Sequence, residues 1–230
     1  MRSMWKGSIS FGLVNIPVRL YTAVEERDIR FNTLHRVCGS PIRYQKYCPH
    51  CERAVPVEEL TRGFPLGNGQ FVPVEDDELE GIQIAAARTV DILDFVSLAE
   101  IDPIYFDRTY YLEPDEGAQK PYALLRRAML ESSRVALARV ALRQKESLAC
   151  VRVYRNALAL ETMYYPDEIR PVERLSGIAA EPELGERELE MAIRLVDQLT
   201  EPFNPEKYRD RYREAVQALM GRVRTHEIED

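Results

Sequence analysis

Alternation of apolar and polar residues through the centre of the chain predicts an antiparallel meander. The stretch from Val135 to Tyr165 divides into runs at 135–142, 148–154 and 157–165, separated by polar segments at 144–147 and 155–156. Two-residue periodicity interrupted by turn residues is typical of strands joined by hairpins. We therefore expect three consecutive strands of one sheet.

Similar patterns predict further strands on the N-terminal side of this meander. A glycine and asparagine turn, Gly67-Asn68-Gly69, favours a hairpin between its flanking apolar residues, and Pro17 favours a bend or a sheet edge. The expected strands lie at residues 8–24, with a bend at 15–17, and at 29–34, 64–66, 70–74, 89–98 and 104–112.

The period changes to that of a helix in three places. Residues 122–133 carry one apolar face, formed by Leu124, Leu125, Ala128 and Met129. After a connecting segment rich in proline and glycine at 166–185, two more amphipathic helices are predicted. Residues 186–199 carry the stripe Leu189, Ile193, Val196 and Leu199, and the helix from Asn204-Pro205 to about Val223 carries Tyr208 and Tyr212.

These elements predict an α+β fold: a mostly stranded body at residues 1–180 and a helical arm at 181–230. The apolar stripes of the arm are expected to be buried against another surface. That surface could come from the chain's own body or from a second subunit, in which case Leu189, Ile193, Val196, Tyr208 and Tyr212 would form a dimer interface.

Charge is unevenly distributed along this acidic chain, whose net charge is −7. Residues 122–160 contain eight basic and two acidic side chains, and residues 1–53 contain nine basic and four acidic side chains. Residues 54–121, by contrast, contain four basic and fifteen acidic side chains. Basic blocks in an acidic protein indicate a surface that meets a polyanion, and a merely solvated sheet face is the alternative.

The basic residues predict contacts to phosphate rather than to base edges. No predicted helix presents the Arg, Asn and Gln side chains that read a major groove, so binding would be independent of sequence. The candidate phosphate contacts are Arg30, Arg36, Arg43, Lys46, Arg139, Arg143, Arg152 and Arg155.

One segment, residues 35–51, has the spacing of a metal site. Cys48 and Cys51 form a CxxC turn, and His35 and Cys38 have the same separation. Two thiolates, a third thiolate and an imidazole would complete a tetrahedral structural zinc site, with His50 as the rival fourth ligand. A redox dithiol and ordinary buried thiols are the alternatives.

Nothing in the sequence points to catalysis. The nucleophile-elbow, phosphate-loop and zinc-protease motifs do not occur. No apolar run approaches the length of a membrane span, and the N-terminus has no signal-peptide pattern. We expect a cytoplasmic protein that is not an enzyme and does not bind membranes, although a hydrolase with an unrecognised site is a further hypothesis.

Several long stretches resemble bacterial Ku proteins, in the order of that family. They are KGSISFGLVNIPVRLY from Lys6, RDIRFNTLH from Arg27, FVSLAEIDPIYFDRTYYLEP from Phe95, RVALAR from Arg134 and FNPEKY from Phe203. Many family members continue into a lysine-rich C-terminal tail, whereas this sequence ends in Glu227-Ile228-Glu229-Asp230.

The resemblance implies a β-barrel core with bridging strands and a C-terminal helical arm. Two subunits would form a ring that threads onto double-stranded DNA ends, near the bacterial nucleoid. The ring would act in non-homologous end joining and recruit the ATP-dependent DNA ligase D. A zinc-stabilised β-barrel that serves only as a protein-interaction scaffold, without DNA binding, is the competing hypothesis.

Overall fold

The chain divides into two compact units in the computed structural model, which describes residues 1–75, 77–78, 88–142, 145–178 and 182–226. The first unit comprises Met1–Glu25 with Arg43–Ile169, and the second comprises Glu26–Ile42 with Arg170–Asp230.

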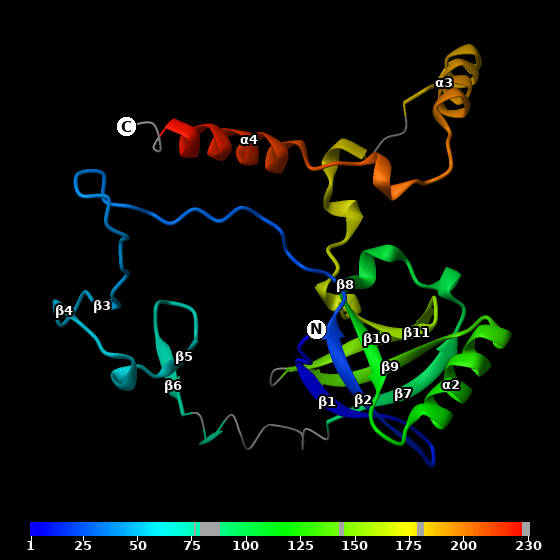
Figure 1. The fold of residues 1–230 in the computed structure, drawn as a ribbon, viewed down its shortest axis with the longest axis horizontal. Coiled ribbons are helices and arrows are strands. Elements are labelled where there is room, and N and C mark those ends of the chain that lie inside the picture. The colour runs from blue at the N-terminus through cyan, green and yellow to red at the C-terminus, as the bar shows by residue number, and fades with distance from the viewer. Residues whose placement is uncertain (76, 79–87, 143–144, 179–181, 227–230) are drawn as a thin grey trace. The chain divides into compact units, whose positions relative to one another are not determined.

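The first unit is built on a closed seven-stranded barrel (Figure 1). Its order is β1-β2-β8-β11-β10-β9-β7, and neighbours are antiparallel except for the parallel pair β1 and β7 that closes it. The strands are β1 Trp5–Phe11, β2 Val14–Thr22, β7 Thr89–Val96, β8 Phe106–Pro114, β9 Val135–Leu142, β10 Lys145–Tyr154 and β11 Ala157–Met163. The α+β fold class and the barrel core are thereby confirmed.

Alternating side chains from all seven strands fill the barrel. Branched aliphatic residues favour this pleated, half-buried environment, and a closed sheet has no unpaired edge to protect. The fully buried large aliphatic side chains are Ile9, Ile16, Val18, Leu20, Val90, Leu112, Val140, Val151, Leu158 and Leu160.

The predicted meander is present as β9, β10 and β11. Tyr154 pairs with Ala157 across the two-residue turn at 155–156. The other predicted turn is shorter than expected, because β10 already begins at Lys145, which pairs with Leu142. Residues 143–144 of that turn lie outside the described part of the chain.

The bend predicted at residues 15–17 is wrong. The β1–β2 turn lies earlier, at Gly12, whose φ of 55° favours glycine. Pro17 is inside β2, opposite Ser8, and its carbonyl oxygen accepts the Asp115 N–H (2.9 Å). In an antiparallel ladder a residue's N–H and C=O point to the same side, so the missing proline donor faces β8 and leaves the β1–β2 ladder intact.

Helix α2, Gln119–Ser132, packs against the barrel core (Figure 1). Its buried side chains are Tyr122, Leu125 and Met129, whereas Leu124 is 71% exposed, so the predicted face was off by part of a turn. The Tyr122 hydroxyl donates to the Leu112 carbonyl oxygen (2.6 Å) and accepts the Leu158 N–H (2.7 Å), and burial raises its pKa. One phenol thus connects β8 with β11 inside the core.

A second apolar cluster covers the outside of β9, β10 and β11. Cys150 is fully buried there between Val135 and Met163, and residues of the 96–106 segment pack against them. That segment contains the short 3-10 turns Leu98–Glu100 and Pro103–Tyr105. Burial raises the pKa of the Cys150 thiol to about 12.

Residues 43–75 form two small two-stranded sheets. The strands are β3 Tyr47–Cys48 with β4 Arg53–Ala54, and β5 Arg62–Pro65 with β6 Phe71–Val74, and a 3-10 turn at Val57–Glu59 lies between the pairs. The predicted hairpin around Gly67-Asn68-Gly69 is therefore confirmed, and all three turn residues have positive φ.

The second unit consists of a loop and the helical arm. The strand predicted at 29–34 is wrong: the only ladder contact there, among the described residues, is a single bridge between Leu34 and Pro41. A 3-10 turn at Pro166–Glu168 ends the first unit, and the second unit resumes with 3-10 turns at Val172–Arg174 and Ser176–Ile178. They precede α3 Glu186–Leu199, a 3-10 turn at Pro205–Lys207 and α4 Arg211–His226.

The helix predicted from Asn204 begins later than expected. The Asn204 side chain does accept the Glu206 N–H (3.1 Å), but it caps the 3-10 turn, and α4 starts only at Arg211. The predicted boundaries of α3 are confirmed.

Candidate nucleic-acid interface

The basic side chains of the meander project from the outer face of the barrel. Arg139 on β9 lies opposite Leu148 on β10, and Arg152 on β10 lies opposite Ala159 on β11. Their strand neighbours Ala138 and Val151 are buried, so alternation turns the arginines outward. Arg139 is exposed, and no carboxylate of the described chain lies within ion-pair distance of it.

Arg152, by contrast, is held within the barrel wall. Its Nε donates to Glu161 Oε2 (2.9 Å), and its Nη2 donates to Glu161 Oε1 (2.7 Å). The residue Glu161 is only 8% exposed, and this paired hydrogen bonding raises the pKa of Arg152. A two-pronged pair of this kind fixes the guanidinium and neutralises its charge locally.

Arg155 lies in the two-residue turn that follows. Its φ is 54°, and its guanidinium stands 5.5 Å from the centre of the Tyr154 ring. Tyr154 also stacks on Tyr111 of β8 at 6.0 Å. A cation over an aromatic face is attracted by the ring quadrupole, which orients Arg155 without a carboxylate.

These aromatic rings line an open groove of about 690 Å³ on the first unit. Tyr21, Glu113 and Asn156 also line it, and the Tyr21 hydroxyl donates to Glu113 Oε2 (2.5 Å). Reasoning from the sequence missed the tyrosines, because Tyr21, Tyr111 and Tyr154 are far apart in the chain. The one sequence signal that could have grouped them is alternation, which would place all three side chains on the same face of the predicted sheet.

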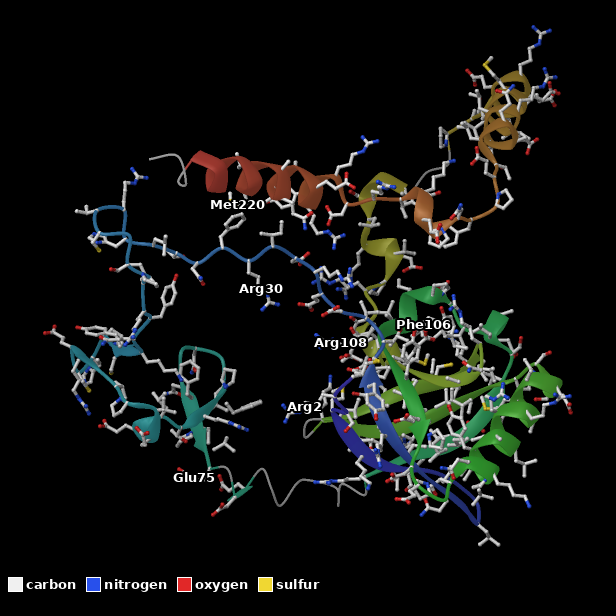
Figure 2. The ribbon with its side chains drawn as sticks, in the orientation of Figure 1. Arg2, Arg30, Glu75, Phe106, Arg108 and Met220 are labelled. Carbon is white, nitrogen blue, oxygen red and sulfur yellow. The ribbon has the colours of Figure 1, made fainter. Side chains whose placement is uncertain are left out.

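The candidate phosphate contacts between residues 30 and 46 are all exposed. Arg30 pairs with Glu26 at 3.1 Å on the 26–34 segment, where Figure 2 labels it. Arg36, Arg43 and Lys46 are exposed and make no ion pair with any described residue. Arg143, the remaining candidate, lies outside the described residues.

Two basic residues near the start of the chain were not among the candidates, and both bind one carboxylate. The Lys6 ammonium lies 2.7 Å from Asp115 Oδ2, and Arg19 donates to Asp115 Oδ1 (2.5 Å). The Glu116 N–H donates to the same carboxylate (2.9 Å). Lys6, this N–H and Arg19 together hold the pKa of Asp115 well below its usual range.

Arg108 is a further exposed basic residue that the sequence reasoning overlooked. It lies near the start of β8, as Figure 2 shows, and its backbone N–H donates to the Thr162 hydroxyl oxygen (3.1 Å). That bond bridges the irregularity in the β8–β11 ladder between Glu161 and Met163.

The predicted metal ligands occur as two local pairs. His35 Nδ1 lies 3.0 Å from Cys38 Sγ, and hydrogen bonds from Ser40 lower the pKa of Cys38 to about 7. Backbone N–H groups of Cys51 and His50 lower the pKa of Cys48, whereas the hydrogen bond to Cys48 raises that of Cys51. Within the described chain, no three potential metal ligands cluster together.

The predicted interface residues of the arm are all exposed. Leu189, Ile193 and Val196 share one side of α3, which has no buried residue, and Tyr208 and Tyr212 are also exposed. None of the described helices combines the length and apolarity needed to cross a membrane.

Comparison with known proteins identifies the class of this barrel. A family model described as the Ku70/Ku80 beta-barrel domain matches residues 10–191. The fold is therefore a Ku-type β-barrel with a helical C-terminal segment.

Relatives narrow this class to a family. A protein of Symbiobacterium thermophilum named Non-homologous end joining protein Ku is 56% identical over 96% of this chain. Proteins of the same name from Heliobacterium modesticaldum and Bacillus subtilis are 50% and 43% identical over 96% and 97% of it. The chain spans 55%, 80% and 71% of these relatives, respectively. It belongs to the bacterial Ku family.

Proposed function

We propose that this chain binds double-stranded DNA ends, without reading their sequence, as a ring-shaped homodimer in non-homologous end joining. The observation that carries the proposal is the family membership, supported by a family model over residues 10–191 and by relatives matched over nearly all of the chain. The proposed site of action is the bacterial cytoplasm, at the nucleoid.

The outer face of the barrel supplies a physical basis for this binding. Every duplex presents the same phosphates, so arginines that face outward can hold any sequence through charge. Arg139 is exposed and makes no ion pair with a described residue, and Arg155 lies over the Tyr154 ring. Arg152 shares its charge with Glu161 and would contribute less.

The uncovered stripe of α3 supports the homodimer. Leu189, Ile193 and Val196 are exposed within one chain although they follow helical spacing. A second copy that covers this stripe would remove it from water, which is the main driving force for association. A closed ring can then load only at a free end.

Recruitment of the ATP-dependent DNA ligase D completes the proposal. The ligase would seal the ends, and the protein itself would contribute binding and alignment without a chemical step. A mixture of ligase and this chain should therefore join ends faster than the ligase alone, and equal joining rates would remove the ligase from the proposal.

The central test compares three DNAs of one sequence: a linear duplex, the same duplex with bulky hairpins at both ends, and a closed circle. Binding only to the free-ended duplex, with steep weakening as salt rises, is the expected result. Equal binding to all three would indicate an open groove instead of a ring. Absence of binding would favour the interaction scaffold.

A residue-level test uses the slope of log affinity against log salt. Each lost phosphate contact lowers this slope by about 0.9. Arg139→Ala and Arg155→Ala each remove one contact from both subunits of the proposed homodimer, so each should lower the slope by about 1.8. Arg127→Ala is the matched control, because Arg127 lies on α2 and pairs with Glu131 at 2.5 Å. An unchanged slope in both test variants would remove this face from the interface.

A further inference from the structure

Three tyrosines form a row across the outer face of the barrel. Tyr21 on β2 lies directly opposite Tyr111 on β8. Tyr111 stacks on Tyr154 of β10, with 6.0 Å between the ring centres and 21° between the ring planes. The strand neighbours Leu20 and Leu112 are buried in the barrel core, so alternation turns the tyrosines away from it. The three rings therefore take no part in packing the barrel interior.

The stack between β8 and β10 crosses a whole strand. Both strands pair with β11, so they lie two strand spacings, about 10 Å, apart. On β11, Ala159 lies opposite Tyr111 and Ala157 lies opposite Tyr154. A methyl group at both positions lets the two rings meet above the strand, since a larger side chain would stand between them. The alanines thereby keep the space above β11 open.

Charge in the groove is divided between β8 and the turn from β10 to β11. On β8, the Glu113 carboxylate accepts a hydrogen bond from the Tyr21 hydroxyl (2.5 Å). In the turn, Arg155 is exposed and lies 5.5 Å from the centre of the Tyr154 ring, and the exposed amide of Asn156 follows it. An anionic ligand is therefore attracted to the turn and repelled by the carboxylate on β8.

We propose that this groove binds one unpaired nucleotide of a single-stranded overhang at the DNA end. The base stacks on Tyr111, the central ring of the row, and the phosphate lies against Arg155. Every base has a flat π face, so tyrosine rings hold any of the four bases without reading them. The inference rests on the proposed function, because the chain has to hold the duplex part of the end first.

An unpaired nucleotide fits this groove better than a duplex or a peptide does. Bases within a duplex are stacked on their neighbours, whereas unpaired bases can turn their faces to aromatic side chains. An extended peptide gains affinity by pairing with an exposed sheet edge, and a closed barrel offers no such edge. The groove volume of about 690 Å³ lies in the range of small-ligand sites.

The test measures binding of the full chain to a blunt duplex and to the same duplex with a short overhang. The first unpaired base is 2-aminopurine, whose fluorescence is quenched when it stacks on an aromatic ring, and both overhang polarities are measured. We expect quenching with at least one polarity. That overhang should also bind about tenfold more tightly than the blunt duplex, which is the size of one stack between a base and an aromatic side chain.

Tyr111→Leu removes the central ring but keeps an apolar side chain, so it should abolish both the quenching and the preference for the overhang. Tyr111→Phe is the matched control, because it keeps the ring and should retain both. Ala157→Leu fills the space above β11 with the tyrosines in place. It should cause the same loss as Tyr111→Leu, and it serves as the second variant if Tyr111→Leu fails to fold.

Equal affinity of the unmodified chain for blunt and overhanging ends, without quenching, would overturn the inference and leave end binding intact. The groove would then be free for a protein partner. A preference for the overhang that survives in both Tyr111→Leu and Ala157→Leu would also overturn it. Absence of binding to all of these DNAs would remove the proposed function and this inference together.

Discussion

The barrel and the helical arm contain similar apolar side chains but differ in how far these side chains are buried. Ten large aliphatic residues of the barrel are fully buried, whereas α3 buries none of its leucine, isoleucine, valine and methionine side chains. The barrel therefore has its own core. The arm has amphipathic helices whose apolar side is uncovered, so its stability depends on what covers that side.

Local interactions alone do not explain an ordered α3. Glu188 accepts the Gly185 N–H (3.1 Å) at its start, but a helix of 14 residues is marginal in water without packing. The barrel therefore has what it needs to fold by itself, and the arm is the part that we propose joins two subunits. Substitutions in the arm should therefore act on association, and substitutions in the barrel should act on folding.

Replacing Leu189, Ile193 and Val196 together by Glu should convert the proposed homodimer to a monomer. Burying one such side chain contributes about 1.5–3 kcal/mol, and about 1.4 kcal/mol is tenfold in affinity, so the dimer should weaken at least about a thousandfold. Sedimentation velocity across a range of concentrations measures this.

Arg187→Glu with Arg194→Glu is the control, because it adds negative charge to α3 away from the apolar stripe. The control should remain a dimer. A dimer of unchanged affinity in the triple variant would show that the stripe packs within its own chain.

Leu160→Ala should destabilise the barrel by about 2–5 kcal/mol, since it opens a cavity among fully buried neighbours. Leu195→Ala removes the same atoms from an exposed position on α3 and should change barrel unfolding by less than about 0.5 kcal/mol. Urea unfolding followed by circular dichroism measures both. Equal losses would contradict the division into two kinds of region.

Tyr122→Phe should destabilise the barrel by about 1–3 kcal/mol, because two buried backbone groups lose their partner. The matched change Tyr208→Phe, on the exposed part of the arm, should be nearly neutral. Thermal unfolding at one protein concentration compares them. A neutral Tyr122→Phe would mean that water replaces the hydroxyl.

Asp115→Asn should reduce stability at neutral pH but not in strong acid. Lys6, the Glu116 N–H and Arg19 lower the pKa of Asp115 in the folded chain, so its carboxylate stabilises the fold above the unfolded pKa of about 3.9. That contribution disappears as the pH falls below this value toward the lower folded pKa. Unfolding curves of both proteins from pH 7 to pH 2 should therefore converge at the acid end, and a constant gap would contradict the assignment.

The strands were predictable wherever a segment with alternating apolar and polar residues also has a partner strand in the fold. The meander and the 62–74 hairpin follow from period and turn residues alone. Residues 29–34 alternate too, yet residues 30–34 are all exposed, and the described chain offers them a single bridge, from Leu34 to Pro41, instead of a partner strand. The bend predicted at Pro17 was wrong because a strand accepts a proline where the missing N–H is not needed by a neighbouring strand. Which neighbour the missing N–H of Pro17 faces is decided by the assembled sheet, not by the local sequence.

The site was predictable as a set of charges but not as a set of contacts. The Arg152–Glu161 pair could have been found, because the 155–156 turn fixes Arg152 opposite Ala159 and makes Glu161 its diagonal neighbour. The Lys6–Asp115 pair could not, since 109 positions separate the two residues in the sequence. The local turns at 35–38 and 48–51 were visible because their spacing is short.

The reactivity of the Cys150 thiol reports how often this part of the barrel wall opens to solvent. A thiol reacts with alkylating reagents as the thiolate, and this one is fully buried with its pKa raised to about 12. The other three cysteines are accessible and can be blocked first. Slow labelling of Cys150 then reports openings of the 96–106 segment that packs against it. DNA bound by the proposed ring should slow this labelling.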